Sequence, residues 1–330
     1  MKQVPLGKSG PMVSVVGLGC MGMSGMYGPA DRKESLATLQ AAVDAGITLL
    51  DTGDFYGMGH NELLIGEALK TIPRGRVLLS VKFGALRDPA GAWMGYDARP
   101  QALKTFLAYS LQRLGVDYID IYRPARLDPQ VPIEDTVGAI ADMIKAGFVR
   151  HIGLSEIGVA TLRRAAAVHP ICDLQIEYSL ISRGIEAQIL PAARQLGVAI
   201  TAYGVLARGL ISGHWRKTAF APGDFRAHAP RFQGADADAN LALVEALRTV
   251  AAARGITVAQ AAIAWVTQRG SDIIPLIGAR RRERLSEALV ALDITLTATD
   301  VAAIEIAVPK DAARGTRYPS AAMGQLDSEK

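Results

Sequence analysis

Short apolar runs alternate with helical patterns along most of the chain. Between the runs, apolar residues recur at helical spacing, most clearly over residues 103–114. Gly46, Gly115 and Gly197 precede further runs and are typical of helix ends. The runs are expected to form strands near residues 15–18, 48–50, 77–81, 119–122, 152–154, 174–176, 198–202 and 272–276.

This alternation indicates parallel strands joined by helices. Eight such units in roughly 280 residues predict an α/β fold, a (β/α)8 TIM barrel. An open doubly wound sheet is the alternative, but no linker or change of composition divides the chain into halves. We therefore expect one domain over residues 1–330, with an N-terminal hairpin (1–16), a barrel (17–295) and a C-terminal helix and tail (296–330).

Two stretches exceed a minimal barrel. They are residues 206–240, rich in Gly, Pro and Ala, and the tail after Val308. Long insertions of this kind are usually functional loops or disordered segments. We expect them to add loops at the C-terminal face of the barrel, where they would shape specificity.

The first expected strand leads into a glycine-rich stretch, residues 17–22, that satisfies the dinucleotide-binding pattern G-x-G-x-x-G. That pattern requires a helix to begin at once, so that its N-terminus can bind a pyrophosphate. Here Ser24, Gly25 and Pro29 follow, and helical character resumes only near Asp31. We therefore favour a barrel strand and its loop over a Rossmann fold.

Several expected strands end in polar side chains. Asp51 ends the second run, Tyr56 lies in the loop that follows, and Lys82 ends the third run. Loops at the carboxyl ends of barrel strands form the active-site face, so these residues are catalytic candidates. A buried Asp–Lys pair beside a packing tyrosine would give the same pattern. Further polar residues that follow such runs are Ser155, Glu156, Gln175, Glu177 and Tyr203.

The eighth run is followed by a glycine turn and a basic helix start, residues 278–284, with Gly278, Arg280 and Arg284 among them. Backbone N–H groups at a helix N-terminus attract phosphate, and arginines favour a dianionic group. Barrels often bind phosphate after this strand, which favours a phosphate site over a solvated charged face.

The composition limits the class of protein. Apolar residues make up 50% and charged residues 21%, which excludes disorder, and no window approaches the ~20 apolar residues of a membrane span. Pro5 and Gly7 interrupt any signal peptide, and the two cysteines, Cys20 and Cys172, fit a reducing compartment. A dispersed charge of +4 does not indicate nucleic-acid binding. We expect a cytoplasmic enzyme with a small-molecule substrate, no membrane or nucleic-acid partner, and no metal.

With these motifs, the chain resembles the aldo-keto reductases nearly from end to end. Residues 50–57, Leu-Asp-Thr-Gly-Asp-Phe-Tyr-Gly, look like the family's Asp–Tyr signature, and Lys82 fits the lysine of its third strand. Tyr203 with Gly209 and Leu210 matches a further motif. Other segments that resemble the family are residues 61–69, 113–122, 149–155 and 274–280.

The resemblance implies NADPH-dependent reduction of a carbonyl substrate. Tyr56 would donate the proton, Lys82 would make its phenol more acidic, and Asp51 would hold Lys82. Ser155 and Gln175 would hold the nicotinamide carboxamide. The other cofactor-binding residues it implies are Tyr203, stacked on the ring; Leu206 and Arg208, near the pyrophosphate; and Gly278, Arg280 and Arg284, at the 2′-phosphate and adenine.

The chain departs from the family at a catalytic position. Most members end the fourth strand with a histidine, where this chain has Ala125, and losing one preorganised donor commonly costs ~10²–10³-fold in rate. None of the five histidines is a convincing replacement. Either Arg123 or Arg126, which flank Ala125, anchors an acidic substrate, or both face solvent. Glu156 also stands where many members have asparagine.

Two alternatives to carbonyl reduction follow from Ala125. One is another redox reaction, such as alcohol oxidation or reduction of a conjugated double bond. The other is an NADP(H)-binding sensor or regulatory protein with residual activity. The retention of Asp51, Tyr56 and Lys82 together favours an enzyme, because a pure binding protein does not need all three.

Overall fold

Eight parallel strands form the centre of the computed structural model, which describes residues 1–330. They are β3 (Gly17–Gly19), β4 (Leu49–Gly53), β5 (Leu78–Phe83), β8 (Ile119–Pro124), β9 (Val149–Ser155), β10 (Ile171–Glu177), β11 (Ala199–Tyr203) and β12 (Ile273–Ile277). They close into a barrel in the order β10-β11-β12-β3-β4-β5-β8-β9. The predicted (β/α)8 barrel is confirmed, and the open-sheet and Rossmann alternatives are wrong.

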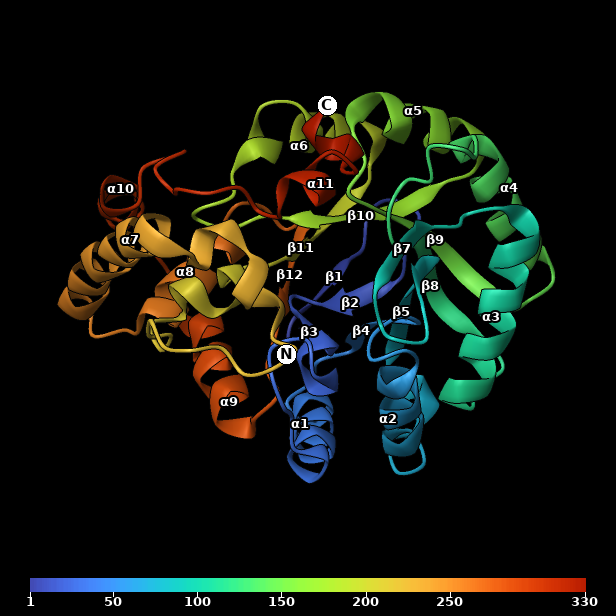
Figure 1. Ribbon diagram of the computed structural model, residues 1–330, viewed down its shortest axis with the longest axis horizontal. Helices are drawn as coiled ribbons and strands as arrows, with labels where there is room; N and C mark the ends of the chain where they lie inside the picture. The colour runs from blue at the N-terminus through green and yellow to red at the C-terminus, as the bar shows by residue number, and fades with distance from the viewer.

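Helices follow the strands and surround the barrel (Figure 1). Local signals set their ends: Pro100 starts α3, Gly115 ends it at a φ of 66°, and Thr257 and Gln260 form a capping box before α8. The helices are α1 (Arg32–Asp44), α2 (His60–Ala68), α3 (Pro100–Leu114), α4 (Ile133–Lys145), α5 (Val159–Val168), α6 (Ile189–Leu196), α7 (Gly234–Ala253), α8 (Val258–Thr267), α9 (Arg282–Val290), α10 (Ala298–Ala307) and α11 (Ser320–Met323).

The N-terminal hairpin closes one end of the barrel. Its strands, β1 (Gln3–Pro5) and β2 (Met12–Ser14), pair antiparallel as expected. Leu6 and Val13 pack against Leu49, Ala199 and other residues near the starts of the barrel strands. The carboxyl ends of the strands therefore remain as the open mouth, which is where loops of a parallel barrel build a site.

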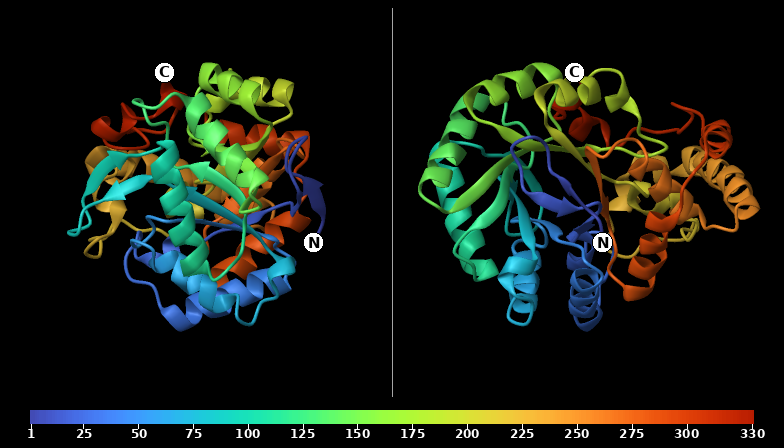
Figure 2. Two further views of the ribbon diagram at one scale, coloured as in Figure 1. Left: turned by 90° about the vertical axis from the view of Figure 1, so that its right-hand side faces the viewer. Right: turned by 180° about the vertical axis from the view of Figure 1, so that it is seen from behind.

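Three additions surround that mouth. A second hairpin, β6 (Ala85–Arg87) with β7 (Trp93–Tyr96), follows β5, and the C-terminal tail carries α11. The stretch 206–240 holds short 3₁₀ turns and the first residues of α7, so it has more regular structure than the sequence suggested. α7 packs against α10 outside the ring of barrel helices (Figures 1 and 2).

No single helix is long and apolar enough to cross a membrane. Together, α7 and α8 are long and apolar enough for such a span, but their axes are bent by 85° relative to each other.

Candidate active site

Asp51 is the centre of a hydrogen-bonded group inside the barrel mouth. Its carboxylate accepts from Lys82 Nζ at 2.5 Å, Ser80 Oγ at 2.9 Å and Gln175 Nε2 at 2.7 Å. The parallel register sets Asp51 opposite Ser80, and Lys82, two residues further along β5, faces the same side of the sheet. Both members of the Asp51–Lys82 pair are buried, so the carboxylate holds the ammonium in a fixed position.

Tyr56 lies beside this pair, in the loop after β4. Lys82 Nζ is 5.2 Å from the centre of the Tyr56 ring. The ring packs edge-on against Phe55, and the Asn61 backbone N–H donates to the Tyr56 carbonyl at 3.2 Å. The phenol oxygen makes no hydrogen bond within the chain, and Tyr56 lines the main cavity. The structure therefore brings together the three residues proposed as catalytic from the sequence.

Burial dominates the electrostatics of the trio. Burial raises the pKa of Tyr56 well above its usual value of 10, and the Asp51 carboxylate adds to the rise. Burial also lowers the pKa of Lys82, although Asp51 opposes that shift. In the chain alone Asp51 pairs with the Lys82 ammonium and burial dominates the pKa of Tyr56, so the acidifying role expected of Lys82 stays a prediction. Tyr56 consequently carries its proton at neutral pH.

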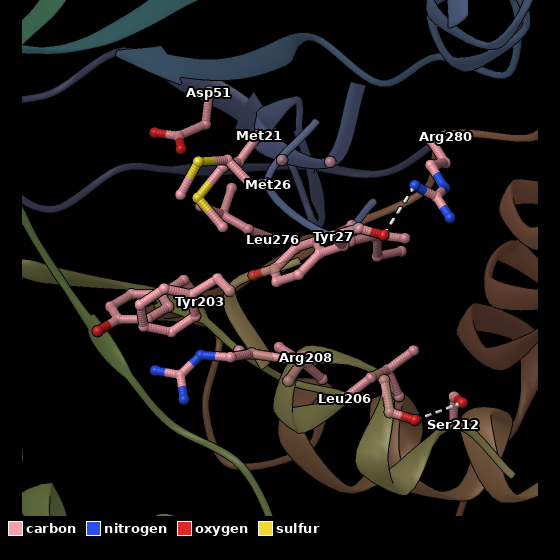
Figure 3. A pocket seen from close by; sticks show the side chains of 18 of the residues that line it. Met21, Met26, Tyr27, Asp51, Tyr203, Leu206, Arg208, Ser212, Leu276 and Arg280 are labelled. Carbon is pink, nitrogen blue, oxygen red and sulfur yellow. Dashed lines mark hydrogen bonds between the residues drawn. The ribbon is translucent and has the colours of Figure 1, made fainter. Parts of the chain in front are cut away.

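The cavity runs from this trio to the basic segment after β12. It has a volume of about 400 Å³, within the usual range for small-molecule sites. Met26 and Tyr27 cover it from the loop after β3, and the Met26 carbonyl accepts from the Phe225 backbone N–H at 3.1 Å. Figure 3 shows Asp51 and Arg280 on opposite sides of the cavity, with Tyr27 between them.

The predicted phosphate site forms the far end of this cavity. Gly278, Arg280 and Arg284 all line it, and a side chain added at Gly278 would meet open space. Arg280 Nη1 donates to the backbone carbonyls of residues 27–29 at 3.1, 3.1 and 2.9 Å. In the chain alone, Arg280 thus holds the covering loop while its guanidinium borders the cavity.

Arg208 is turned away from that end. It lines the cavity with Leu206, but its guanidinium donates to the Arg317 carbonyl, lies 3.4 Å from Glu177 Oε2 and stacks 4.4 Å from the centre of the Tyr318 ring. Only its backbone, in a left-handed conformation with φ 58°, remains for a pyrophosphate. The cofactor-binding role of Arg208 stays a prediction, and in this arrangement it would use the backbone.

Comparisons with known proteins agree with the barrel. The model of the Aldo/keto reductase family matches residues 15–309. A probable aldo-keto reductase 1 of Glycine max is 38% identical over 320 residues, covering 96% of this chain and 92% of that protein. This chain belongs to the aldo/keto reductase family.

Solved structures of aldo/keto reductases share the whole architecture. A glycerol dehydrogenase from Gluconobacter oxydans superposes with a TM-score of 0.83 and 28% identity, over 93% of this chain and 94% of that chain. A thermostable aldo-keto reductase in complex with the inhibitor epalrestat gives a TM-score of 0.73 and 25% identity, over 93% and 100% of the two chains. The chain is thus an oxidoreductase of a family that acts on carbonyl groups.

The cavity of this aldo/keto reductase fits the nicotinamide cofactor that the family generally uses. Seven lysine or arginine side chains and only two carboxylates line it, an excess that suits a polyanionic nucleotide. Gln175 donates its amide N–H to Asp51, which leaves its amide oxygen free to accept from a carboxamide. Ser155 is buried at the end of β9, with Arg126 Nη1 3.4 Å from its hydroxyl. Tyr203 also lines the cavity, and Figure 3 shows it near Arg208.

The two arginines beside Ala125 have different surroundings. Ala125 is itself buried, and its backbone N–H donates to the Phe83 carbonyl. Arg123 is fully buried inside the barrel, where it donates to Asp173 at 2.8 Å and Ser80 at 2.9 Å, so the solvent-facing alternative is wrong for it. Arg126 lines the cavity.

The C-terminal tail supplies residues that the sequence did not indicate. Arg317 is buried and donates to both carboxylate oxygens of Glu156, at 2.9 and 2.8 Å. The Tyr318 hydroxyl lies 2.9 Å from the Tyr203 hydroxyl and accepts from Arg126 Nη2 at 3.1 Å. Nothing in the sequence pairs these positions, because the Arg317–Glu156 partners are 161 residues apart. Glu156, noted as a departure from the family, is thus the anchor of the tail.

Among the five histidines, only His214 lines the cavity. His60 bonds Ser24, and His151 lies in the first half of β9, away from the mouth. His214 does line the cavity, but at its basic end, where it contacts Arg284 at 2.8 Å and Glu287 at 2.7 Å.

Proposed function

We propose that this aldo/keto reductase uses NADPH to reduce an aldehyde or ketone to an alcohol, with Tyr56 as the proton donor. The observation that carries the proposal is the free Tyr56 hydroxyl, which lines the same cavity as the Asp51–Lys82 pair and makes no bond within the chain. A cytoplasmic location, expected from the composition, stays a prediction.

The chain's own residues account for proton delivery. Tyr56 holds its proton because its pKa is raised, so a carbonyl oxygen in the cavity meets a hydrogen-bond donor. As that oxygen gains negative charge, its basicity rises and the phenol proton moves to it. The phenolate left behind faces the Lys82 ammonium, 5.2 Å from its ring, which Asp51 keeps in position. A positioned acid of this kind typically contributes ~10²–10⁴-fold in rate.

The cofactor-binding roles follow the two ends of the cavity. When bound, the nicotinamide supplies the hydride that reduces the carbonyl carbon. The free amide oxygen of Gln175 would accept from the carboxamide, the Ser155 hydroxyl would assist, and the Tyr203 ring would stack on the nicotinamide. At the other end, Arg280 and Arg284 would bind the 2′-phosphate, where the fork of a guanidinium suits a dianion.

The test is a panel of aldehydes, ketones and quinones with NADPH, followed by loss of NADPH absorbance. Tyr56→Phe should reduce kcat by at least about 100-fold and leave the Kd for NADPH unchanged, because only the proton is removed. Tyr109→Phe, an exposed tyrosine on α3, is the matched control and should behave as wild type.

Two results would redirect the assignment. Turnover that survives in Tyr56→Phe would place the acid elsewhere. Tight NADPH binding without turnover of any carbonyl, or of any alcohol with NADP⁺, would favour the sensor or regulatory alternative that Ala125 raises.

A further inference from the structure

Arg126 is a partly buried arginine in the wall of the cavity, and no carboxylate lies within ion-pair distance of its side chain. Its guanidinium donates to the Ala125 carbonyl at 2.6 Å, to the Tyr318 hydroxyl at 3.1 Å and to the Ser155 hydroxyl at a long 3.4 Å. A guanidinium has five N–H donors, so two of them meet no acceptor in the chain. The guanidinium therefore borders the cavity without a direct ion pair, although the Glu156 carboxylate favours its charge from a greater distance.

Five other arginines near the barrel mouth are paired with carboxylates. Each of them lies within 4 Å of a carboxylate that is itself almost completely buried, so each charge is neutralised inside the protein. The pairs are Arg123–Asp173, Arg208–Glu177, Arg226–Asp224, Arg231–Glu177 and Arg317–Glu156.

No nearby carboxylate is free to pair with Arg126. Glu156 is already bound by both nitrogens of the Arg317 fork and by the Tyr203 hydroxyl. Asp51 is bound by Lys82 and its neighbours within the barrel. A partly buried guanidinium that lines a cavity with unused N–H donors and no ion-pair partner is well placed to bind an anionic group of a ligand.

The position of Arg126 places that charge at the substrate end. It follows Ala125 directly after β8, and its charge acts on both Tyr56 and Lys82, so it lies on the side of the cavity that the catalytic trio occupies. The basic cluster for the cofactor phosphate, with Arg280, lies at the opposite end (Figure 3). The cofactor phosphates therefore do not account for Arg126.

We propose that Arg126 binds a carboxylate of the substrate, so that the enzyme reduces carbonyl compounds that also carry a carboxylate group. This inference rests on the proposed carbonyl reduction. Two N–H groups of one guanidinium can bind both carboxylate oxygens, a geometry that a neutral substrate does not use. The anchored carboxylate then fixes the carbonyl beside Tyr56, which compensates for a side chain at Ala125 that cannot orient the substrate.

The test compares each acid with its methyl ester. The probes are ortho-, meta- and para-carboxybenzaldehyde, succinic semialdehyde and the four methyl esters, all with NADPH. The wild-type enzyme should favour at least one acid over its ester by at least roughly tenfold in kcat/KM. Arg126→Gln should lower kcat/KM for that acid by roughly 10- to 100-fold and change the ester by less than about threefold.

Two further variants control for charge and folding. Arg99→Gln removes a charge just before α3, from a side chain paired with Asp97 and outside the cavity, and should leave the acid preference intact. Arg126→Lys keeps the charge without the fork and should retain part of the preference. The Kd for NADPH should be unchanged in Arg126→Gln, which would show that the variant is folded.

Failure of the inference and failure of the proposed function give different results. If no acid or ester is reduced, the proposed function fails, and calorimetry with benzoate in the presence of NADPH then tests Arg126 alone. Benzoate binding that is lost in Arg126→Gln would support the carboxylate site. The carboxylate site would be overturned by equal kcat/KM values for acids and esters, or by an acid preference that survives in Arg126→Gln. If the enzyme reduces none of the probes, the absence of benzoate binding would also overturn it.

Discussion

Replacing Arg317 by glutamine should detach the C-terminal tail from the barrel mouth. Arg317 joins the tail to Glu156 of the barrel through two hydrogen bonds, and it donates two more to Glu329 within the tail, at 3.0 and 2.6 Å. Glu156 is fully buried, and its backbone is in a left-handed conformation with φ 51°. A residue other than glycine keeps this unfavourable conformation only when its surrounding contacts stabilise it. Without Arg317 its carboxylate would be buried and unpaired while the tail is docked.

The size of the effect follows from the contacts that remain. Removing one member of a buried ion pair typically costs ~3–5 kcal/mol. Tyr203 and Ser328 still donate to Glu156 in the variant, so we take the lower end, ~3 kcal/mol. Because 1.36 kcal/mol corresponds to a factor of ten, the open state of the tail should become about 100-fold more populated.

Hydrogen exchange followed by mass spectrometry measures this directly. Peptides over residues 316–330 should exchange about 100-fold faster in Arg317→Gln, while those of the barrel strands keep their protection. Arg314→Gln is the matched control, since Arg314 is an exposed arginine of the same tail whose side chain makes no hydrogen bond. The double variant Glu156→Gln, Arg317→Gln should recover part of the protection, because it leaves no unpaired charge.

The pH dependence gives a second check. Burial opposes ionisation of Glu156, but the Arg317 guanidinium outweighs it and holds the pKa of that carboxyl well below its usual 4.5. The stability from this pair is therefore full above pH ~4.5 and is lost as pH falls further, because the open state takes up a proton first. At pH 7, the tail of Arg317→Gln could instead exchange at a rate within about threefold of the wild-type rate. The free-energy difference would then be less than about 1 kcal/mol, and the reasoning would be refuted.

Two further predictions concern the cofactor and the pH dependence of stability. Arg280→Ala should weaken NADPH binding by at least about tenfold and NADH binding much less, measured by fluorescence quenching; equal losses would contradict a phosphate role. Asp54 is half-buried with an unpaired Oδ1, and burial followed by the Glu62 charge raises its pKa to about 7. The folded state then binds the proton of the Asp54 carboxyl more tightly than the unfolded state does. The free energy of unfolding should therefore fall by roughly 2–4 kcal/mol as pH rises from about 4 to 7. Asp54→Asn should remove that fall in urea unfolding, and an unchanged pH profile would refute it.

The barrel was readable from the sequence because parallel strands are buried on both faces. Such strands appear as continuous apolar runs, and β5, expected at 77–81, lies at Leu78–Phe83. The expected strands tend to stop too early, because a polar residue resembles the end of an apolar run. Lys82 and Glu177 lie inside their strands, since their side chains point into the mouth and not into solvent.

The catalytic trio was predictable for the same reason. Asp51 and Lys82 lie on neighbouring strands whose register follows from the fold, so their contact needs no long-range information. The direction of the Tyr56 pKa was not predictable, because it depends on how completely Asp51 neutralises Lys82 and on how deeply the phenol is buried. The orientation of Arg208 depends on Glu177 and the tail, and no local pattern contains it.

The two halves of the cavity differ in how they are built, which explains why the family can be recognised while the substrate cannot. The cofactor half is formed by strand ends and the turn after β12, each set by short-range signals. The substrate half depends on contacts between distant positions, such as Arg126 with Tyr318 across 192 residues. A hydrogen-bonded chain runs from Arg126 through Tyr318 and Tyr203 to Glu156 and Arg317. A change at Arg126 or Tyr318 would alter the substrate site while Gln175, Arg280 and Arg284 stay in place, so specificity can change without loss of the family's chemistry.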